Sequence, residues 1–267
     1  MSGQLNGKVA VVTGAGRGIG RATAVALARE GAHVACVART ASQLAETAAL
    51  VRAAGRRAQQ IEADIGEPGS PSLIAAEVLA DLGANDILVN NAATVQPAGP
   101  TATAGPDDWA WAIAVNLTGP VRLTLAVLDA MIRRGYGRIV NVSSGIAAAP
   151  GAMPGLNVYA ASKAALEAHT LGLAAELAGT GVTVNIVRPG PVDTAMPAWI
   201  LAQPPAQIGE QVPEVRERQA GDRADVGVRR AAPAGSIAGS PHGRMAPAHP
   251  GGRGPLAGHE AGGSLSG

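Results

Sequence analysis

Val9-Ala10-Val11-Val12-Thr13-Gly14-Ala15-Gly16-Arg17-Gly18-Ile19-Gly20 is the stretch that decides the fold of this chain. It opens with a short, continuously apolar run, which is typical of a strand buried on both faces of a parallel sheet. A glycine-rich turn follows, and residues 21–30 are expected to form a helix. Glycine permits positive φ and lets backbone N–H groups approach a phosphate, while a helix N-terminus favours negative charge. The stretch therefore predicts a phosphate-binding turn with the candidate residues Gly14, Arg17, Gly18, Ile19 and Gly20.

The spacing of this turn is Thr-Gly-x-x-x-Gly-x-Gly, and no register of it gives Gly-x-Gly-x-x-Gly. A glycine-rich turn without a ligand is therefore the alternative interpretation.

The next predicted strand, residues 33–37, runs into Ala38-Arg39. An acidic residue near this point would bind the ribose 2′-hydroxyl of NAD, whereas an arginine accommodates the 2′-phosphate of NADP. Because no carboxylate appears there and Arg39 with Arg17 could clamp a phosphate, we expect NADP rather than NAD; a solvated arginine at a strand end is the alternative.

Strand-like and helix-like segments alternate through the rest of residues 1–212. Strands are expected at 57–62, 86–89, 138–142 and 182–187, and helices at 41–54, 72–82, 107–133 and 157–178, with Ser42 as a possible cap and Pro120 as a possible kink. These alternations predict one α/β domain, a doubly wound, Rossmann-like parallel sheet with helices on both faces. Such sheets bind ligands at the carboxyl ends of their strands, where Asp64, Ile65 and Asn91 lie. For Asp64 a turn cap, and for Asn91 a purely structural role, is the alternative.

Tyr159 and Lys163 are four residues apart in the expected helix 157–178, so they share one face. An ammonium beside a phenol favours the phenolate and lowers its pKa, so that the phenol can exchange a proton with an alcohol or carbonyl near neutral pH. An accidental surface pair is the alternative. A Ser-Ser pair ending at Ser144 follows the fifth strand. Asn116 lies among apolar residues of a helix, and it is either a structural polar plug or part of a proton path.

The composition argues against several classes of protein. The net charge is +1 and no Lys/Arg cluster alternates with aromatic residues, so nucleic acid is not an expected partner. The single Cys36 excludes an internal disulfide framework and fits a reducing compartment. The N-terminus has no apolar signal core, no apolar run is long enough to span a bilayer, and the 5 His show no ligand spacing. We therefore expect a cytoplasmic protein without a metal and without a membrane partner.

The composition changes near the end of the chain. Gly, Pro and Ser make up 22 of the 55 residues in 213–267, and this segment has no aromatic residue. Such a segment cannot bury enough surface to offset its ordering entropy, so residues 213–267 are predicted to form a disordered tail. Its Arg, Gly, Pro, Ala and His bias leads to the hypothesis of a reading-frame change in a GC-rich gene.

Several motifs of this chain together resemble those of the short-chain dehydrogenase/reductase family, in the subgroup that includes 3-oxoacyl-carrier-protein reductases. Residues 13–20 are similar to its cofactor motif, and Asn90-Asn91-Ala92-Ala93 to its Asn-Asn-Ala-Gly motif, with Ala93 in place of glycine. Asn116, Ser144, Tyr159 and Lys163 match its catalytic tetrad, and Pro189-Gly190 with Thr194 its nicotinamide-side turn. The resemblance covers residues 7–199, and the segment between Ser144 and Tyr159 is about two residues longer than the family leads us to expect.

The resemblance implies a role for each matched residue. Tyr159 would be the general acid or base, Lys163 would lower its pKa and hold the nicotinamide ribose, Ser144 would orient the substrate carbonyl, and Asn116 would hold a water. The cofactor contacts would come from the glycine turn, Arg39, Asp64, Ile65, Asn91, Tyr159, Lys163, Pro189, Gly190, Val192 and Thr194. The hydride transfer itself belongs to the cofactor. The resemblance also implies a homodimer or homotetramer.

We therefore expect an NADP-dependent oxidoreductase that acts on a carbonyl/alcohol pair. The segments 145–156 and 195–208 are mostly apolar and uncharged and are expected to form pocket loops, which favours an apolar or acyl-type small-molecule substrate. One alternative is a non-catalytic NADP-binding protein whose unusual C-terminus has impaired the substrate site. The other is a structural or partner-binding subunit without a cofactor, against which the intact glycine turn argues.

Overall fold

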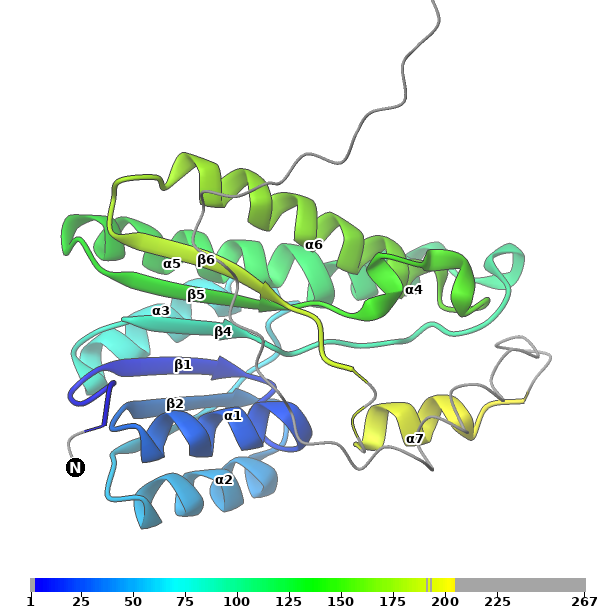
Figure 1. Ribbon diagram of the computed structural model, residues 1–267. Helices are drawn as coiled ribbons and strands as arrows, with labels where there is room; N and C mark the ends of the chain where they lie inside the picture. Colours follow the sequence, from blue (N-terminus) through cyan, green and yellow to red (C-terminus); the bar gives the residue numbers. More distant parts are fainter. Residues whose placement is uncertain (1–2, 191, 193, 205–267) are drawn as a thin grey trace, which may run out of the picture. The chain divides into compact units, whose positions relative to one another are not determined.

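The computed structural model describes residues 3–190, 192 and 194–204, and the tail predicted for residues 213–267 lies outside this range. In the described part, parallel pairing joins six strands in the order β3-β2-β1-β4-β5-β6 (Figure 1). The strands are β1 (Val9–Thr13), β2 (His33–Ala38), β3 (Ala58–Glu62), β4 (Ile87–Asn90), β5 (Gly137–Val142) and β6 (Val182–Val187). The expected doubly wound sheet is confirmed, and the strand order reverses between β1 and β4, where ligands of such sheets bind.

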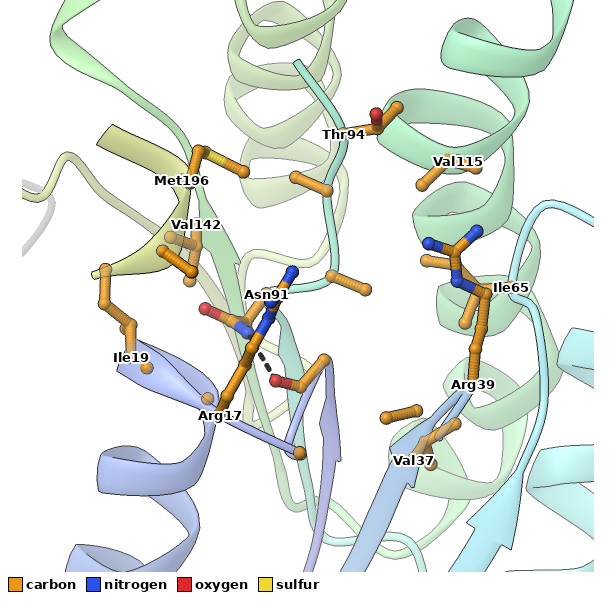
Figure 2. A pocket seen from close by; sticks show the side chains of 18 of the residues that line it. Arg17, Ile19, Val37, Arg39, Ile65, Asn91, Thr94, Val115, Val142 and Met196 are labelled. Atoms are coloured by element: carbon orange, nitrogen blue, oxygen red, sulfur yellow. Dashed lines mark hydrogen bonds between the residues drawn. The ribbon is translucent and has the colours of Figure 1, made fainter. Parts of the chain in front are cut away.

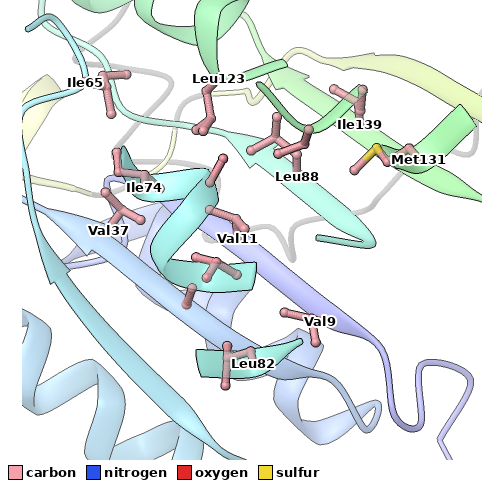
Figure 3. Packing of buried hydrophobic residues seen from close by; sticks show 14 of the residues in the cluster. Val9, Val11, Val37, Ile65, Ile74, Leu82, Leu88, Leu123, Met131 and Ile139 are labelled. Atoms are coloured by element: carbon pink, nitrogen blue, oxygen red, sulfur yellow. The ribbon is translucent and has the colours of Figure 1, made fainter. Parts of the chain in front are cut away.

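Helices pack on both faces of this sheet. The helices α1 (Gly18–Arg29) and α2 (Ala41–Ala53) cover one face, and α3 (Ser70–Leu82), α5 (Gly119–Arg133) and α6 (Asn157–Glu176) cover the other. Since successive strand side chains point to opposite faces, β1 sends Ala10 and Val12 toward α1 and α2 and sends Val9 and Val11 to the opposite core. Figure 3 shows this second core, in which α3 packs across β1 and β2.

The expected long helix over 107–133 is interrupted. It consists of α4 (Pro106–Ile113), a π-helical turn over Ala114–Thr118 and α5. A β-carbon on Gly119 would lie 2.4 Å from the Ile65 carbonyl oxygen, so the chain needs glycine at this close approach. Pro120 lies in the first turn of α5, where its missing N–H costs nothing. The break therefore precedes Pro120, and Asn116 lies within it.

The joined helix 106–133 also corrects the expectation about membrane spans. By length and composition it could cross a bilayer, contrary to the prediction that no stretch is long enough. In the structure 44% of its apolar window is buried, and Leu123, Val127 and Met131 pack into the core beside the sheet. A buried core helix of this kind meets the same length and composition test.

Two local expectations were wrong. Ser42 does not cap α2, because Thr40 precedes the helix and Ser42 lies inside it. The expected loop 195–208 begins with a helix, α7 (Ala195–Leu201). On the face that carries α1 and α2, no helix of the described part lies over β5 and β6, and Thr183, Asn185 and Val187 of β6 are exposed (Figure 1).

Candidate active site

A cleft of about 500 Å³ lies at the carboxyl ends of the strands. Its walls come from the glycine-rich turn, the ends of β2, β3, β4 and β5, the helices α4 and α6 and the start of α7. Most of the expected cofactor residues line it: Gly14, Arg17, Gly18, Ile19, Gly20, Arg39, Asp64, Ile65, Asn91, Tyr159, Lys163 and Thr194. Asn116, Ser144, Pro189, Gly190 and Val192 are not among its lining residues.

The glycine-rich turn is shaped so that side chains are excluded from it. Gly14 and Gly18 have φ of 65° and 55°, in the region that favours glycine. A β-carbon on Gly20 would lie 2.2 Å from the Gly14 carbonyl oxygen and 2.6 Å from Asn91 Nδ2. The turn thus brings bare backbone to the cleft at the N-terminus of α1, an arrangement that suits the pyrophosphate of a dinucleotide. On this observation the residues present fit a nicotinamide dinucleotide.

Asn91 is held inside the protein framework. Its Nδ2 donates to the Thr13 carbonyl oxygen at 2.9 Å and to the Gly14 carbonyl oxygen at 3.4 Å, while its backbone N–H donates to Thr13 Oγ1 at 3.0 Å. The Asn91 amide therefore fixes β4 against the glycine-rich turn, which supports the structural alternative for this residue (Figure 2). Thr13 is a functional residue that sequence reasoning missed, although it is the first residue of the recognised motif.

The charged end of the cleft contains Arg17, Arg39 and Asp64. Arg39 lies at the end of β2 on the side of α4, across the cleft from Arg17 (Figure 2). Its Nη1 is 3.4 Å from Asp64 Oδ2, and the two side chains are 62% and 26% exposed. Asp64 Oδ1 also accepts the Gly66 backbone N–H at 2.9 Å, so Asp64 does cap a turn. Both arginines line the same cleft.

Tyr159 and Lys163 line the cleft from the first turns of α6. Lys163 is buried and its Nζ donates to the Val142 carbonyl oxygen at 2.7 Å. Burial lowers the pKa of Lys163 from 10.5 to about 8. Burial also raises the pKa of Tyr159 above its ordinary value, and a hydrogen bond with the Ser144 side chain partly opposes this. The expected lowering of the Tyr159 pKa by Lys163 is therefore absent from this structure, in which burial is the larger effect.

Asn116 lies in the π-helical turn and is fully buried. Its Oδ1 accepts the Thr94 backbone N–H at 2.8 Å, and its Nδ2 donates to the Thr94 carbonyl oxygen at 2.8 Å and to Ser162 Oγ at 3.1 Å. The side chain thus fixes the segment after β4 to α6, as a structural polar plug does. The Thr94 contact was missed, because nothing in the sequence pairs two residues 22 positions apart.

Beside the expected Ser144, the structure reveals a polar network that sequence reasoning also missed. Ser143 Oγ donates to Glu167 Oε1 at 2.6 Å, and Arg188 donates to Glu167 through Nε at 2.7 Å and through Nη2. The Arg188 hydrogen bond is the main reason that the pKa of Glu167 lies below its ordinary value. The network joins the residue after β5, helix α6 and the residue before Pro189, so it connects the segments that carry Ser144, Lys163 and Pro189.

The segment 145–156 contains short turns and packs beside Tyr159. Ile146 and Leu156 are buried in a cluster with Val95, Tyr159 and Ile200. This segment was expected to line a pocket, but it does not line the 500 Å³ cleft. In the part of the chain that the structure describes, no group of three or more His, Cys, Asp or Glu could hold a metal ion.

A family model described as short chain dehydrogenase matches residues 8–204. The chain belongs to this family. It is therefore a nicotinamide-dependent oxidoreductase acting on CH–OH or carbonyl groups. The chain is 42% identical over 198 residues to a short chain dehydrogenase of Pseudocercospora fijiensis, covering 73% of this chain but only 63% of that protein. It is 38% identical over 223 residues to the 3-oxoacyl-[acyl-carrier-protein] reductase FabG of Pseudomonas aeruginosa, covering 83% and 89% of the two chains.

Solved structures of short-chain dehydrogenases share its fold. An NAD⁺-bound xylitol dehydrogenase superimposes with a TM-score of 0.73 at 33% identity, over 81% of this chain and 84% of the other. A metagenomic short-chain oxidoreductase in complex with NADP superimposes with a TM-score of 0.66 at 39% identity, over 70% and 83% of the two chains. These relatives bind different nicotinamide cofactors, so the preference of this chain must be argued from its own residues.

Proposed function

We propose that this chain is an NADP-dependent oxidoreductase that transfers a hydride between the nicotinamide and a carbonyl/alcohol substrate, with Tyr159 as general acid or base. The observation that carries the proposal is one cleft that is lined by a glycine-rich turn, by two arginines, and by Tyr159 and Lys163. Arg17 and Arg39 support NADP, since Asp64, the carboxylate near the end of β3, is already bonded to Arg39 and to the Gly66 N–H.

The roles of the residues follow from their positions. When bound, the nicotinamide supplies or accepts the hydride. The Tyr159 hydroxyl gives its proton to the carbonyl oxygen in reduction and takes it back in oxidation. Its raised pKa keeps the phenol protonated at neutral pH, which suits the acid role. Ser144, hydrogen-bonded to Tyr159, orients the carbonyl, and Lys163 holds the nicotinamide ribose.

An apolar or acyl-type substrate is the class that this site favours. The cluster beside Tyr159 contains Val95, Ile146, Leu156 and Ile200, and Met153, Met196 and Trp199 pack against it. Of these, Met196 also lines the cleft. Apolar ketones or acyl thioesters should therefore give higher kcat/KM than sugars of similar carbonyl reactivity, and turnover of charged sugars alone would overturn this substrate class.

A homodimer or homotetramer is proposed as the assembly. Leu125 and Ile132 of α5 and Leu171 of α6 are large apolar side chains that are 62%, 39% and 67% exposed, and their two helices pack on the same face of the sheet (Figure 1). Sedimentation of the full chain tests this: Leu171→Glu should shift the mass toward the monomer, and a monomeric wild type would contradict it. The cytoplasmic location stays a prediction from the sequence.

The first experiment compares wild type with Tyr159→Phe. The wild type should be stabilised against heat more by NADPH than by NADH, because ligands that bind only the folded state raise the midpoint. Tyr159→Phe should keep the NADPH shift and lose about 10²- to 10⁴-fold in kcat. If wild type and Tyr159→Phe both bind NADPH but neither turns over substrate measurably, the non-catalytic alternative would be favoured. A larger shift with NADH would overturn the cofactor preference.

A further inference from the structure

Trp111 lines the cofactor cleft, and neither the motifs nor the proposed function assigns it a role. It lies in α4, one turn before Val115, which also lines the cleft. Residues four apart on a helix share a face, so Trp111 and Val115 form one wall. Among the described lining residues, Trp111 and Tyr159 are the aromatic ones, and Tyr159 belongs to the catalytic end.

Trp111 faces Arg39 across a gap that would accommodate one flat ring if it widened by about 1 Å. The Arg39 guanidinium carbon is 6.0 Å from the centre of the indole. Optimal van der Waals separation is about 3.5 Å, so two stacked layers around an inserted ring need about 7 Å. The observed distance is too long for direct stacking and about 1 Å short of room for a third ring. The ion pair between Arg39 and Asp64 is exposed on the Arg39 side and is therefore weak, so the guanidinium can move away from the indole.

The charge distribution identifies the ring that enters this gap. Arg39 follows β2 and the phosphate-binding turn follows β1, whereas Lys163 contacts the Val142 carbonyl oxygen at the end of β5, three strands along the sheet from β2. The nicotinamide must reach Tyr159, so the ring beside Arg39 is the adenine. Resting on the proposed function, we propose that Trp111 is the adenine-stacking residue of this chain and that the base is held between its indole and the Arg39 guanidinium.

The same helix provides a matched control. Trp109, two residues earlier, is half-buried and lines a separate cavity of about 200 Å³ with Asp108 and Asn157. Trp109 and Trp111 therefore share a helix and a residue type but face different cavities. The chain has 3 Trp, and the third, Trp199, packs in the apolar cluster beside Tyr159.

The test measures binding by calorimetry to wild type, Trp111→Leu, Trp111→Phe and Trp109→Leu. The ligands are NADPH, 2′,5′-ADP, which carries adenine but no nicotinamide, and reduced nicotinamide mononucleotide, which carries no adenine. Stacking of one base on an aromatic side chain is worth about 1–3 kcal/mol, so Trp111→Leu should weaken 2′,5′-ADP and NADPH by about 5- to 150-fold. Trp111→Phe should retain most of the affinity, and Trp109→Leu all of it. The mononucleotide should bind wild type and Trp111→Leu equally.

Indole fluorescence gives a second readout in a protein that keeps Trp111. In Trp109→Leu, 2′,5′-ADP should quench the emission, and in Trp111→Leu it should not; the first measurement stands even if Trp111→Leu fails to fold. Unchanged 2′,5′-ADP affinity in Trp111→Leu, an equal loss in Trp109→Leu, or no quenching in Trp109→Leu would overturn the inference while leaving the proposed function intact. A wild type that binds neither NADPH nor NADH would overturn both.

Discussion

Replacing Glu167 with glutamine should destabilise the protein far more than removing an ordinary surface charge. The Glu167 side chain is 11% exposed and accepts hydrogen bonds from the buried Ser143 and, through two nitrogens, from Arg188. Glutamine has the same shape but has one acceptor oxygen and no charge. Because Oε1 accepts from Ser143 and Arg188 Nε and Oε2 accepts from Arg188 Nη2, the NH₂ group of glutamine would face a guanidinium nitrogen in either orientation, which is a donor-to-donor contact.

The magnitude follows from the burial of each partner. The Ser143 bond to a carboxylate, at 2.6 Å and away from water, contributes about 1.5 kcal/mol, the low end for charged hydrogen bonds. Arg188 is 51% exposed, so its two bonds together are discounted to about 0.5 kcal/mol. The expected loss is about 2 kcal/mol, which for a domain of this size lowers Tm by about 4–8 °C.

The assay is thermal unfolding at neutral pH, with Asp129→Asn as control. Asp129 pairs with Arg133 on the outside of α5, and the two side chains are 76% and 67% exposed, so its removal should cost less than about 0.5 kcal/mol. The pKa of Glu167 is lowered by folding, so its contribution is present above its ordinary pKa of 4.5 and disappears as pH falls through the folded value. The gap between wild type and Glu167→Gln should therefore narrow in acid. A Glu167→Gln shift no larger than that of Asp129→Asn, or a gap that does not depend on pH, would refute the reasoning.

Two further predictions concern Lys163 and the glycine-rich turn. Folding lowers the pKa of Lys163 from 10.5 to about 8, so between these pH values the unfolded chain binds more protons than the folded protein. The free energy of unfolding of wild type, relative to that of Lys163→Met, should therefore rise with pH in this range. A difference in urea unfolding that does not depend on pH would contradict this. Gly20→Ala places a β-carbon 2.2 Å from the Gly14 carbonyl oxygen, so it should cost about 1–3 kcal/mol and abolish the NADPH-induced thermal shift. The control Gly172→Ala, in α6 with no neighbouring atom within 4 Å of the new β-carbon, should stabilise by about 0.5–1 kcal/mol, and equal behaviour of the two variants would show that the turn tolerates a side chain.

The strands and the doubly wound parallel sheet could be predicted from the sequence because their signals are local. The apolar run of β1 and the turn that follows it are contiguous, and the alternation of strands and helices then limits the topology. The break in the helix before Pro120 was less accessible, since it depends on the close approach of Gly119 to Ile65, which comes from a different part of the chain. Sequence patterns report periodicity within one segment, and they do not report such contacts between segments.

The candidate site likewise has features that a local sequence pattern reveals and features that only contacts between distant segments reveal. Tyr159 and Lys163 could be found because their spacing of four residues is visible in the sequence. The pKa of Tyr159 could not be inferred from that spacing, because the decisive effect is burial by the surrounding structure. Glu167 with Arg188, and Trp111 with Arg39, were missed for a related reason: each pair joins residues at least 21 positions apart.

The burial of Lys163 makes this protein well suited to a direct spectroscopic titration. The chain has only two lysines, and the other, Lys8, lies beside the Tyr136 ring near the start of β1. Isotope labelling of lysine side chains would therefore give two signals in a magnetic resonance spectrum instead of the crowded region seen for most proteins. The Lys163 signal should change its chemical shift near pH 8. The protonation state of the Lys163 ammonium could thus be followed in the unmodified chain, with and without NADPH, and without replacing a residue of the candidate site.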